Sequence, residues 1–136
     1  MTDIAIQTVW AIIPVKRLDE SKQRLSLILS ADERAGLMLA LLENLLRVLA
    51  EVPEIDQILV VTADERAAET AMVAGAFVLP EQRPYGLNSA ISQAANHAAG
   101  QGADVVLILP ADLPFVRPED IRQMLAATDT ANGPLV

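Results

Sequence analysis

The sequence predicts an α/β fold in which helices cover both faces of a mostly parallel, twisted sheet. Four short and mostly apolar runs, at residues 8–14, 55–62, 77–79 and 105–109, are each followed by a segment of helical character. Runs of this kind are typical of strands that are buried on both faces. A chain that alternates strands with helices builds a parallel sheet sandwiched between layers of helices.

The first strand and the first helix are the most clearly marked elements. The strand covers residues 8–14 (TVWAIIP), and Pro14 is expected to end it. Ser30 and Glu33 are spaced as a capping box, in which each side chain bonds the backbone amide of the other residue. A long and mostly buried helix is predicted after this box, because apolar residues recur there at helical spacing. They are Met38, Leu41, Leu42, Leu45 and Leu49.

The remaining elements continue the alternation. Gly75 stands where a left-handed residue ends a helix, and Pro118 suits the first turn of another. Residues 132–136 have the pattern of a turn followed by the start of a further strand. The later strands are expected at 55–62, 77–79 and 105–109, and the later helices at 63–74, 87–99 and 118–127.

Composition favours one soluble, cytoplasmic domain. The chain has 136 residues and no cysteine, which excludes disulfides and favours a reducing compartment. Met1, Thr2 and Asp3 form no basic leader of the kind that opens a signal peptide. The most apolar stretch, 37–46, is too short to span a bilayer.

The charge distribution indicates where a ligand binds. The net charge of -8 argues against a nucleic acid polymer as partner, because phosphate backbones require a basic surface. Residues 1–30 nevertheless carry four bases and three acids, and both lysines of the chain lie there. Such a basic island suits a small anionic ligand. A solvated loop is the alternative that charge alone leaves open.

Ligands of open α/β sheets bind beyond the carboxyl ends of the strands, and the first loop at that edge is basic. It runs over residues 14–25 and contains no glycine, so it is neither a P-loop nor a dinucleotide fingerprint. Side chains must therefore meet the charge of a phosphate. Lys16 and Lys22 suit point-charge contacts, and Arg24 suits a two-pronged grip.

Two further segments lie at the same predicted edge. Gly86 allows close approach to a ligand, the amides of the following helix suit an anion, and Asn88 can read a base or a ribose. Helix capping is the alternative for Gly86 and Asn88. Asp112 lies between two prolines, just after a buried strand. Mg²⁺ is the favoured partner of its carboxylate. Hydrogen bonding to nearby amides of the turn is the alternative.

Other conspicuous residues are assigned to packing or to helix ends. A serine hydrolase is poorly supported, because the chain offers no histidine in a shared pattern with a serine. We assign Trp10 to the core, Met38 and Met72 to packing, His97 to surface or helix packing, and Glu119 and Asp120 to a helix N-terminus.

The segments AIIPVKRLDESKQRL, GLNSA and LILPADLPF together resemble the 2-phospho-L-lactate guanylyltransferases, a family that includes phosphoenolpyruvate and 3-phospho-D-glycerate forms. The resemblance runs over essentially the whole chain. Wider relatives are the molybdenum-cofactor guanylyltransferases and the sugar nucleotidyltransferases. Their first loop is usually rich in glycine, and its lack of glycine here favours the narrower family.

The resemblance implies a three-layer α/β/α sandwich of the nucleotide-diphospho-sugar transferase type. It implies transfer of GMP from GTP to a phosphorylated three-carbon acid, with release of pyrophosphate, in coenzyme F-420 biosynthesis. The implied partners are GTP, Mg²⁺ and the acid. The hydropathy pattern predicts no membrane partner, and the sequence leaves the oligomeric state open, with a homodimer as one alternative. The implied site has Lys16, Lys22 and Arg24 on the triphosphate, Gly86, Leu87 and Asn88 on the nucleoside, and Asp112 on Mg²⁺.

Members of the family continue well beyond residue 136. We therefore expect residues 1–136 to form a single nucleotidyltransferase domain that lacks the C-terminal part of the family domain. Such a chain would keep the nucleotide half of the site and have weak turnover by itself. The alternatives are a molybdenum-cofactor or other nucleotidyltransferase, and an inactive nucleotide-binding fragment.

Overall fold

Strands and helices alternate along the chain in the computed structural model, which describes residues 7–18, 22–81 and 87–131. The predicted order is confirmed from the first strand to the last helix. The strands are β1 (Val9–Val15), β2 (Gln57–Thr62), β3 (Phe77–Pro80) and β4 (Val105–Ile108). The helices are α1 (Ala31–Ala50), α2 (Glu65–Val73), α3 (Leu87–Gly100) and α4 (Pro118–Ala131), with a short 3-10 helix, η2, at Gln23–Leu25.

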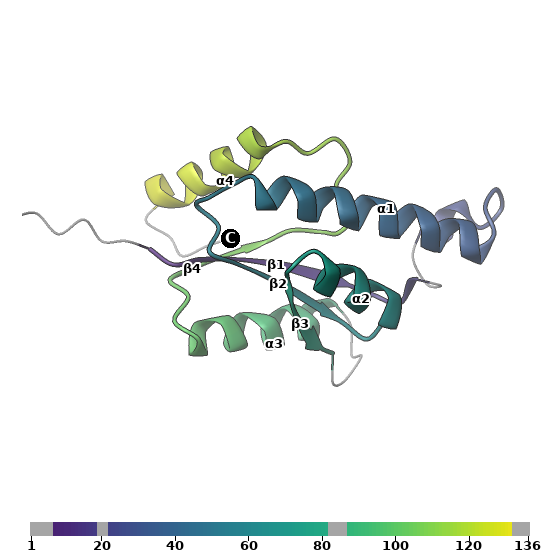
Figure 1. The fold of residues 1–136 in the computed structure, drawn as a ribbon, viewed down its shortest axis with the longest axis horizontal. Helices are drawn as coiled ribbons and strands as arrows, with labels where there is room; N and C mark the ends of the chain where they lie inside the picture. Colours follow the sequence, from purple (N-terminus) through teal and green to yellow (C-terminus); the bar gives the residue numbers. More distant parts are fainter. Residues whose placement is uncertain (1–6, 19–21, 82–86, 132–136) are drawn as a thin grey trace, which may run out of the picture.

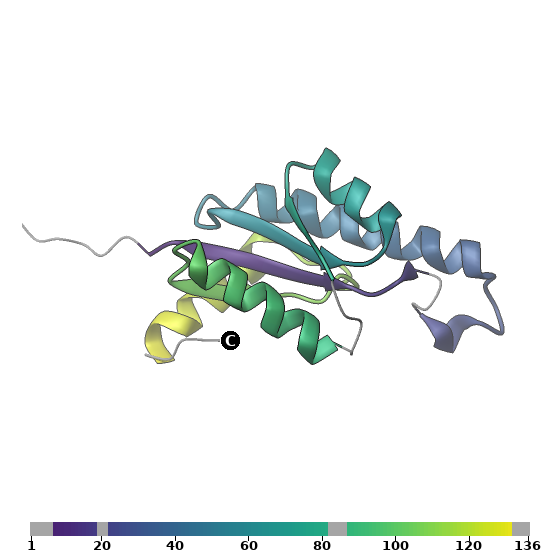
Figure 2. The same cartoon turned by 90° about the horizontal axis from the view of Figure 1, so that it is seen from below.

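The four strands form one parallel sheet in the order β3-β2-β1-β4. Helices α1, α2 and α4 cover one face and α3 covers the other (Figures 1 and 2). This is the expected three-layer α/β/α sandwich. Parallel strands joined by helices need this double cover, because both faces of the sheet are apolar.

Strand β1 lies at the centre of the core. Ala11, Ile13 and Val15 pack against the α1 side, whereas Trp10 and Ile12 pack against α3. Successive side chains of a strand point to opposite faces, so an apolar run fills two cores at once. The buried residues of α1 include Met38, which is 7% exposed, as the helical spacing predicted.

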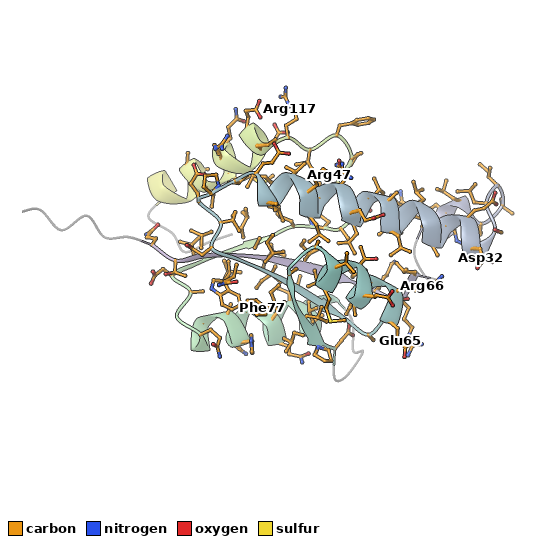
Figure 3. All side chains as sticks on the ribbon, in the orientation of Figure 1. Asp32, Arg47, Glu65, Arg66, Phe77 and Arg117 are labelled. Carbon is orange, nitrogen blue, oxygen red and sulfur yellow. The ribbon has the colours of Figure 1, made fainter. Side chains whose placement is uncertain are left out.

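An aromatic cluster covers the amino end of the sheet on the α3 side. The rings of Trp10 and Phe77 are stacked with centroids 6.4 Å apart, and His97 meets Trp10 edge-on at 6.3 Å. Figure 3 places Phe77 toward one end of the sheet, with Glu65 and Arg66 toward the other. Trp10 is 6% exposed, which confirms its assignment to the core. His97 is exposed on α3 and contacts the Trp10 ring, as its assignment to surface or helix packing predicted.

The predicted helix ends are confirmed where side chains define them. Ser30 Oγ accepts a bond from the Glu33 amide at 3.1 Å, and the Glu33 carboxylate accepts one from the Ser30 amide at 2.8 Å. Gly75 has a φ of 85°, in the left-handed region expected for it. At α4, the Asp120 carboxylate accepts a bond from the Arg117 amide.

Pro14 does not end the first strand, which is a correction to the prediction. β1 continues to Val15, and Pro14 pairs with Val61 of β2. The Ile12 carbonyl accepts a bond from Leu109 on the β4 side, and pairing with β4 stops at Ile12. Since Pro14 faces the same side two residues later, its missing N–H deprives no neighbour of a bond.

Two predictions about the second helix are also wrong. It begins at Glu65 instead of Ala63, because Asp64 caps it with its side chain. Met72 is 60% exposed and is no packing residue. Only the small residues Ala67 and Ala71 of α2 are buried, and a helix turns by about 100° per residue, so Met72 faces outward.

No helix among the described residues is long and apolar enough to cross a membrane.

A matched pair of leucines tests the core. Leu45 is 0% exposed and Leu27 is 96% exposed. We expect Leu45→Ala to lower the free energy of unfolding by about 3 kcal/mol, because it leaves a cavity in the core. Leu27→Ala should change it by less than ~0.5 kcal/mol. Urea unfolding followed by circular dichroism measures both, and equal effects would contradict the packing described.

Candidate functional site

The carboxyl ends of the strands meet at one edge of the sheet. Val15 pairs with Thr62 at the ends of β1 and β2, and the Leu109 amide beyond β4 bonds Ile12 at 2.9 Å. The loop after β1, the turn after β2 and the turn after β4 therefore leave the sheet together. Open parallel sheets bind their ligands at this edge.

The basic loop leaves the centre of this edge. Lys16 and Arg17 follow β1 directly and both are exposed, whereas the next residue, Leu18, is fully buried. Arg24 is exposed on η2, two residues after Lys22. The loop thus has a buried anchor and presents its cations to solvent.

Lys22 and Asp112 come into contact although 90 residues separate them. The Nζ of Lys22 lies 3.3 Å from the Oδ2 of Asp112, with side chains 29% and 47% exposed. Lys22 has a φ of 55°, a left-handed conformation that is uncommon for a residue other than glycine. The predicted meeting of the basic loop with the turn after β4 is confirmed by this contact.

The predicted nucleoside segment can be placed only in part. Gly86 lies outside the described residues. Leu87 and Asn88 form the first turn of α3, which is described for its backbone. The contacts expected of these three residues stay a prediction.

Two further polar residues, Thr62 and Asp64, lie at this edge and were not predicted from the sequence. The buried hydroxyl of Thr62 donates to the Val15 carbonyl at 2.7 Å and accepts a bond from the Asp64 amide at 3.0 Å. The Asp64 carboxylate accepts bonds from the Leu18 amide and from two amides of α2. An aspartate just before an alanine-rich helix is a recognisable N-cap signal, which could have identified Asp64.

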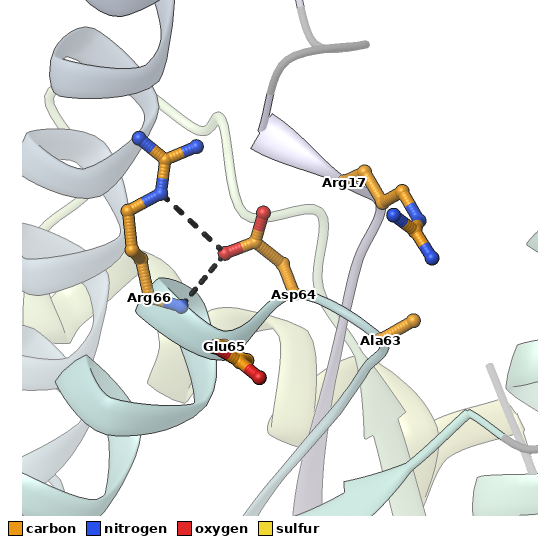
Figure 4. Close-up of a pocket in the computed structure, with 5 residues that line it drawn as sticks. All are labelled: Arg17, Ala63, Asp64, Glu65 and Arg66. Carbon is orange, nitrogen blue, oxygen red and sulfur yellow. Dashed lines mark hydrogen bonds and ion pairs between the residues drawn. The ribbon is translucent and has the colours of Figure 1, made fainter.

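A polar hollow of about 490 Å³ opens between the basic loop and the start of α2 (Figure 4). Its lining residues are Arg17, Ala63, Asp64, Glu65 and Arg66. The Nε of Arg66 lies 3.9 Å from Asp64 Oδ1, and the side chain of Arg17 points away from that carboxylate. The hollow adds two guanidinium groups to a carboxyl edge that already carries Lys16 and Lys22.

The donors at the edge fit a magnesium ion only when it arrives with phosphate. Across residues 7–18, 22–81 and 87–131, no group of three or more His, Cys, Asp or Glu side chains could hold a metal. Asp112 supplies one carboxylate, which is paired with the ammonium group of Lys22. Mg²⁺ commonly uses one or two carboxylates together with substrate phosphates and water, so a lone aspartate is compatible with that mode.

Comparison with protein families places residues 9–133 in a match to the family described as guanylyl transferase CofC like. Among similar proteins, the phosphoenolpyruvate guanylyltransferase of Sphaerobacter thermophilus is 37% identical over 120 residues, which are 88% of this chain and 58% of that protein. The 2-phospho-L-lactate guanylyltransferase of Methanothermobacter thermautotrophicus is 39% identical over 115 residues, 85% of this chain and 50% of that protein. The matched part of the chain therefore spans between half and three-fifths of the length of these relatives.

Solved structures share the fold. One described as a nucleotide-diphospho-sugar transferase from Desulfovibrio desulfuricans G20 superposes with a TM-score of 0.73 at 18% identity, over 90% of this chain and 55% of that one. CMP:2-keto-3-deoxy-manno-octonic acid synthetase, solved with CTP, gives a TM-score of 0.63 at 15% identity, over 91% and 48%. At such identities the likeness concerns the fold, and it confirms the predicted nucleotide-diphospho-sugar transferase type.

The contact between Lys22 and Asp112 should contribute little to stability. Exposed ion pairs are typically worth less than about 1 kcal/mol, because water and salt screen them. A double-mutant cycle with Lys22→Ala and Asp112→Ala in urea unfolding should give a coupling energy below that value. A coupling of several kcal/mol would mean that the pair is structural and not held ready for a ligand.

Proposed function

Because this chain belongs to the guanylyl transferase CofC like family, we propose that its protein transfers GMP from GTP to a phosphorylated three-carbon acid. The acid is 2-phospho-L-lactate, phosphoenolpyruvate or 3-phospho-D-glycerate, pyrophosphate is released, and the product serves coenzyme F-420 biosynthesis. The observation that carries the proposal is the contact between Lys22 and Asp112 at the carboxyl edge. It joins a cation suited to phosphate with a carboxylate suited to the metal that accompanies phosphate.

The basic loop is proposed to receive the triphosphate. Lys16, Lys22 and Arg24 are charged and come from a segment without glycine. Lys16 directly follows β1, whereas Arg24 lies further along the loop on η2. Their side chains, and not a cradle of backbone amides, would therefore meet the phosphate oxygens. Gly86, Leu87 and Asn88 are proposed to contact the guanosine at the start of α3.

Asp112 is proposed to hold Mg²⁺ together with oxygens of the bound triphosphate. In the described structure its carboxylate is paired with Lys22. Binding of a magnesium nucleotide would replace this pair with two better matched ones, the lysine on phosphate and the carboxylate on the metal. When bound, the ion neutralises charge on the phosphates and on the departing pyrophosphate.

The chemistry asks little more of the chain than alignment and charge. A phosphate monoester is largely dianionic at neutral pH, since its second pKa is about 6. Its oxygen can attack the α-phosphorus of GTP without a general base, and the bond to the pyrophosphate breaks. Positioning and electrostatic stabilisation dominate the catalysis of such transfers. An edge that carries several cations together with the carboxylate of Asp112 supplies that charge.

Nucleotide preference tests the proposed substrate. GTP with Mg²⁺ should raise the thermal unfolding temperature, because a ligand that binds only the folded state stabilises it by about 2.7 kcal/mol at a hundredfold excess over Kd. CTP and ATP should stabilise less. Pyrophosphate release with GTP and each of the three acids identifies the acceptor. Stabilisation by CTP above that by GTP would contradict the proposal.

Replacing the proposed metal ligand gives a second test. We expect Asp112→Asn to weaken Mg²⁺-dependent binding of GTP about 10- to 100-fold, since contacts to charged groups are worth about 1.5–3 kcal/mol. Isothermal titration with and without Mg²⁺ measures the effect.

Asp104→Asn is the matched control. Asp104 bonds the Thr8 amide at the opposite edge of the sheet, so its substitution should leave the affinity for GTP unchanged. Equal affinities for the unaltered chain and Asp112→Asn would remove Asp112 from the site.

A further inference from the structure

The turn after β2 holds the backbone from which Lys16 and Arg17 project. We propose that Asp64, together with Thr62, is a positioning residue that fixes this part of the basic loop for the triphosphate. The inference rests on the proposed function, because the triphosphate is the ligand for which the loop is held. Neither residue is proposed to touch the nucleotide.

The bonds of these two residues hold the backbone on both sides of Lys16 and Arg17. Thr62 donates its hydroxyl to the Val15 carbonyl at 2.7 Å, just before the two cations. The Asp64 Oδ2 accepts the Leu18 amide at 2.9 Å, just after them. The Asp64 amide in turn donates to the Thr62 hydroxyl at 3.0 Å, so the two residues are also linked to each other.

The carboxylate of Asp64 does two things at once. Its Oδ1 caps α2 by accepting the amides of Arg66 and Ala67 at 2.9 and 3.1 Å. Its Oδ2 is left for Leu18, whose side chain is fully buried. A carboxylate has two acceptor oxygens and its bonds to amides are charge-assisted, so aspartate suits both tasks together. The side chain is only 10% exposed, which shields these bonds from water.

The consequence concerns the cost of binding. Lys16 is exposed and its side chain is long, so a ligand must order it. A backbone that is already fixed on both sides leaves less to be ordered, and preorganisation of this kind improves affinity. Loss of the tie at Leu18 should therefore weaken contacts to the triphosphate and leave contacts to the nucleoside intact.

The amino end of β1 offers a matched comparison. There the Asp56 carboxylate accepts a bond from the Val9 amide at 2.7 Å, which is the same kind of bond at the other end of the strand. No cation of the basic loop lies next to it, because Val9 begins the strand and Lys16 follows its end. Asp56 thus separates the effect of losing such a bond from the effect of releasing the loop.

Asp64→Asn separates capping from positioning. Asparagine is a good N-cap, so its carbonyl oxygen should keep α2 capped. Its amide group then turns toward the Leu18 N–H, and two donors cannot bond. We expect Kd for magnesium GTP to rise about tenfold and Kd for GMP to change less than about twofold. Asp56→Asn should alter neither value.

Thr62→Val is the second variant, since it keeps the shape of the side chain and removes the hydroxyl bond to Val15. It should show the same selective loss for GTP. The ligand-free chain gives an independent measurement, the hydrogen exchange of the Leu18 amide. The Leu18 amide should exchange about tenfold faster in Asp64→Asn than in the unaltered chain, while the amides of α2 stay protected.

These measurements can contradict the positioning role and the proposed function separately. Unchanged GTP affinity in both variants, unchanged exchange at Leu18, or an equal loss in Asp56→Asn would overturn the positioning role while leaving the proposed function standing. An equal loss for GTP and GMP would assign the two residues to general stability and overturn it as well. If the unaltered chain binds no magnesium GTP, the proposed function fails, and the inference fails with it.

Discussion

Everything at the candidate site depends on the parallel pairing of β1 between β2 and β4. The register aligns Val15 with Thr62 and ends the β4 pairing at Ile12 and Ile108, so three connecting segments leave from the same end of the sheet. The same strand is buried on both faces and anchors both cores. Its position therefore stabilises the domain and sets where the charged loops can meet.

Much of the fold could be predicted because its signals are local. Apolar runs, helical spacing, the capping box of Ser30 and Glu33 and the left-handed Gly75 each lie within a few residues, and the structure confirms them. Pro14 and Met72 could not be predicted in the same way. The tolerance of a proline depends on where a neighbouring strand stops, and the exposure of a methionine depends on which helix face meets the sheet.

The candidate site, too, could be predicted from the sequence only in part. The meeting of Lys22 with Asp112 followed from a topological rule, because carboxyl ends of parallel strands share an edge whatever the length between them. Asp64 was not predicted as a site residue, because the sequence pattern placed it within the helix expected at 63–74. Its other bond goes to Leu18, 46 residues away, and no local pattern signals such a partner. The roles of Gly86, Leu87 and Asn88 remain a prediction from sequence.

The aromatic cluster at the amino end of the sheet has a practical consequence. Trp10 is the single tryptophan of the chain and is buried against Phe77 and His97, at the end of β1 away from the basic loop. Its emission is a built-in optical probe of the packed core. The indole of Trp10 lies near the amino end of β1, and a nucleotide bound at the basic loop would lie beyond the carboxyl end of that strand. A change in the Trp10 emission on adding nucleotide would therefore report a rearrangement transmitted through the sheet and not direct quenching.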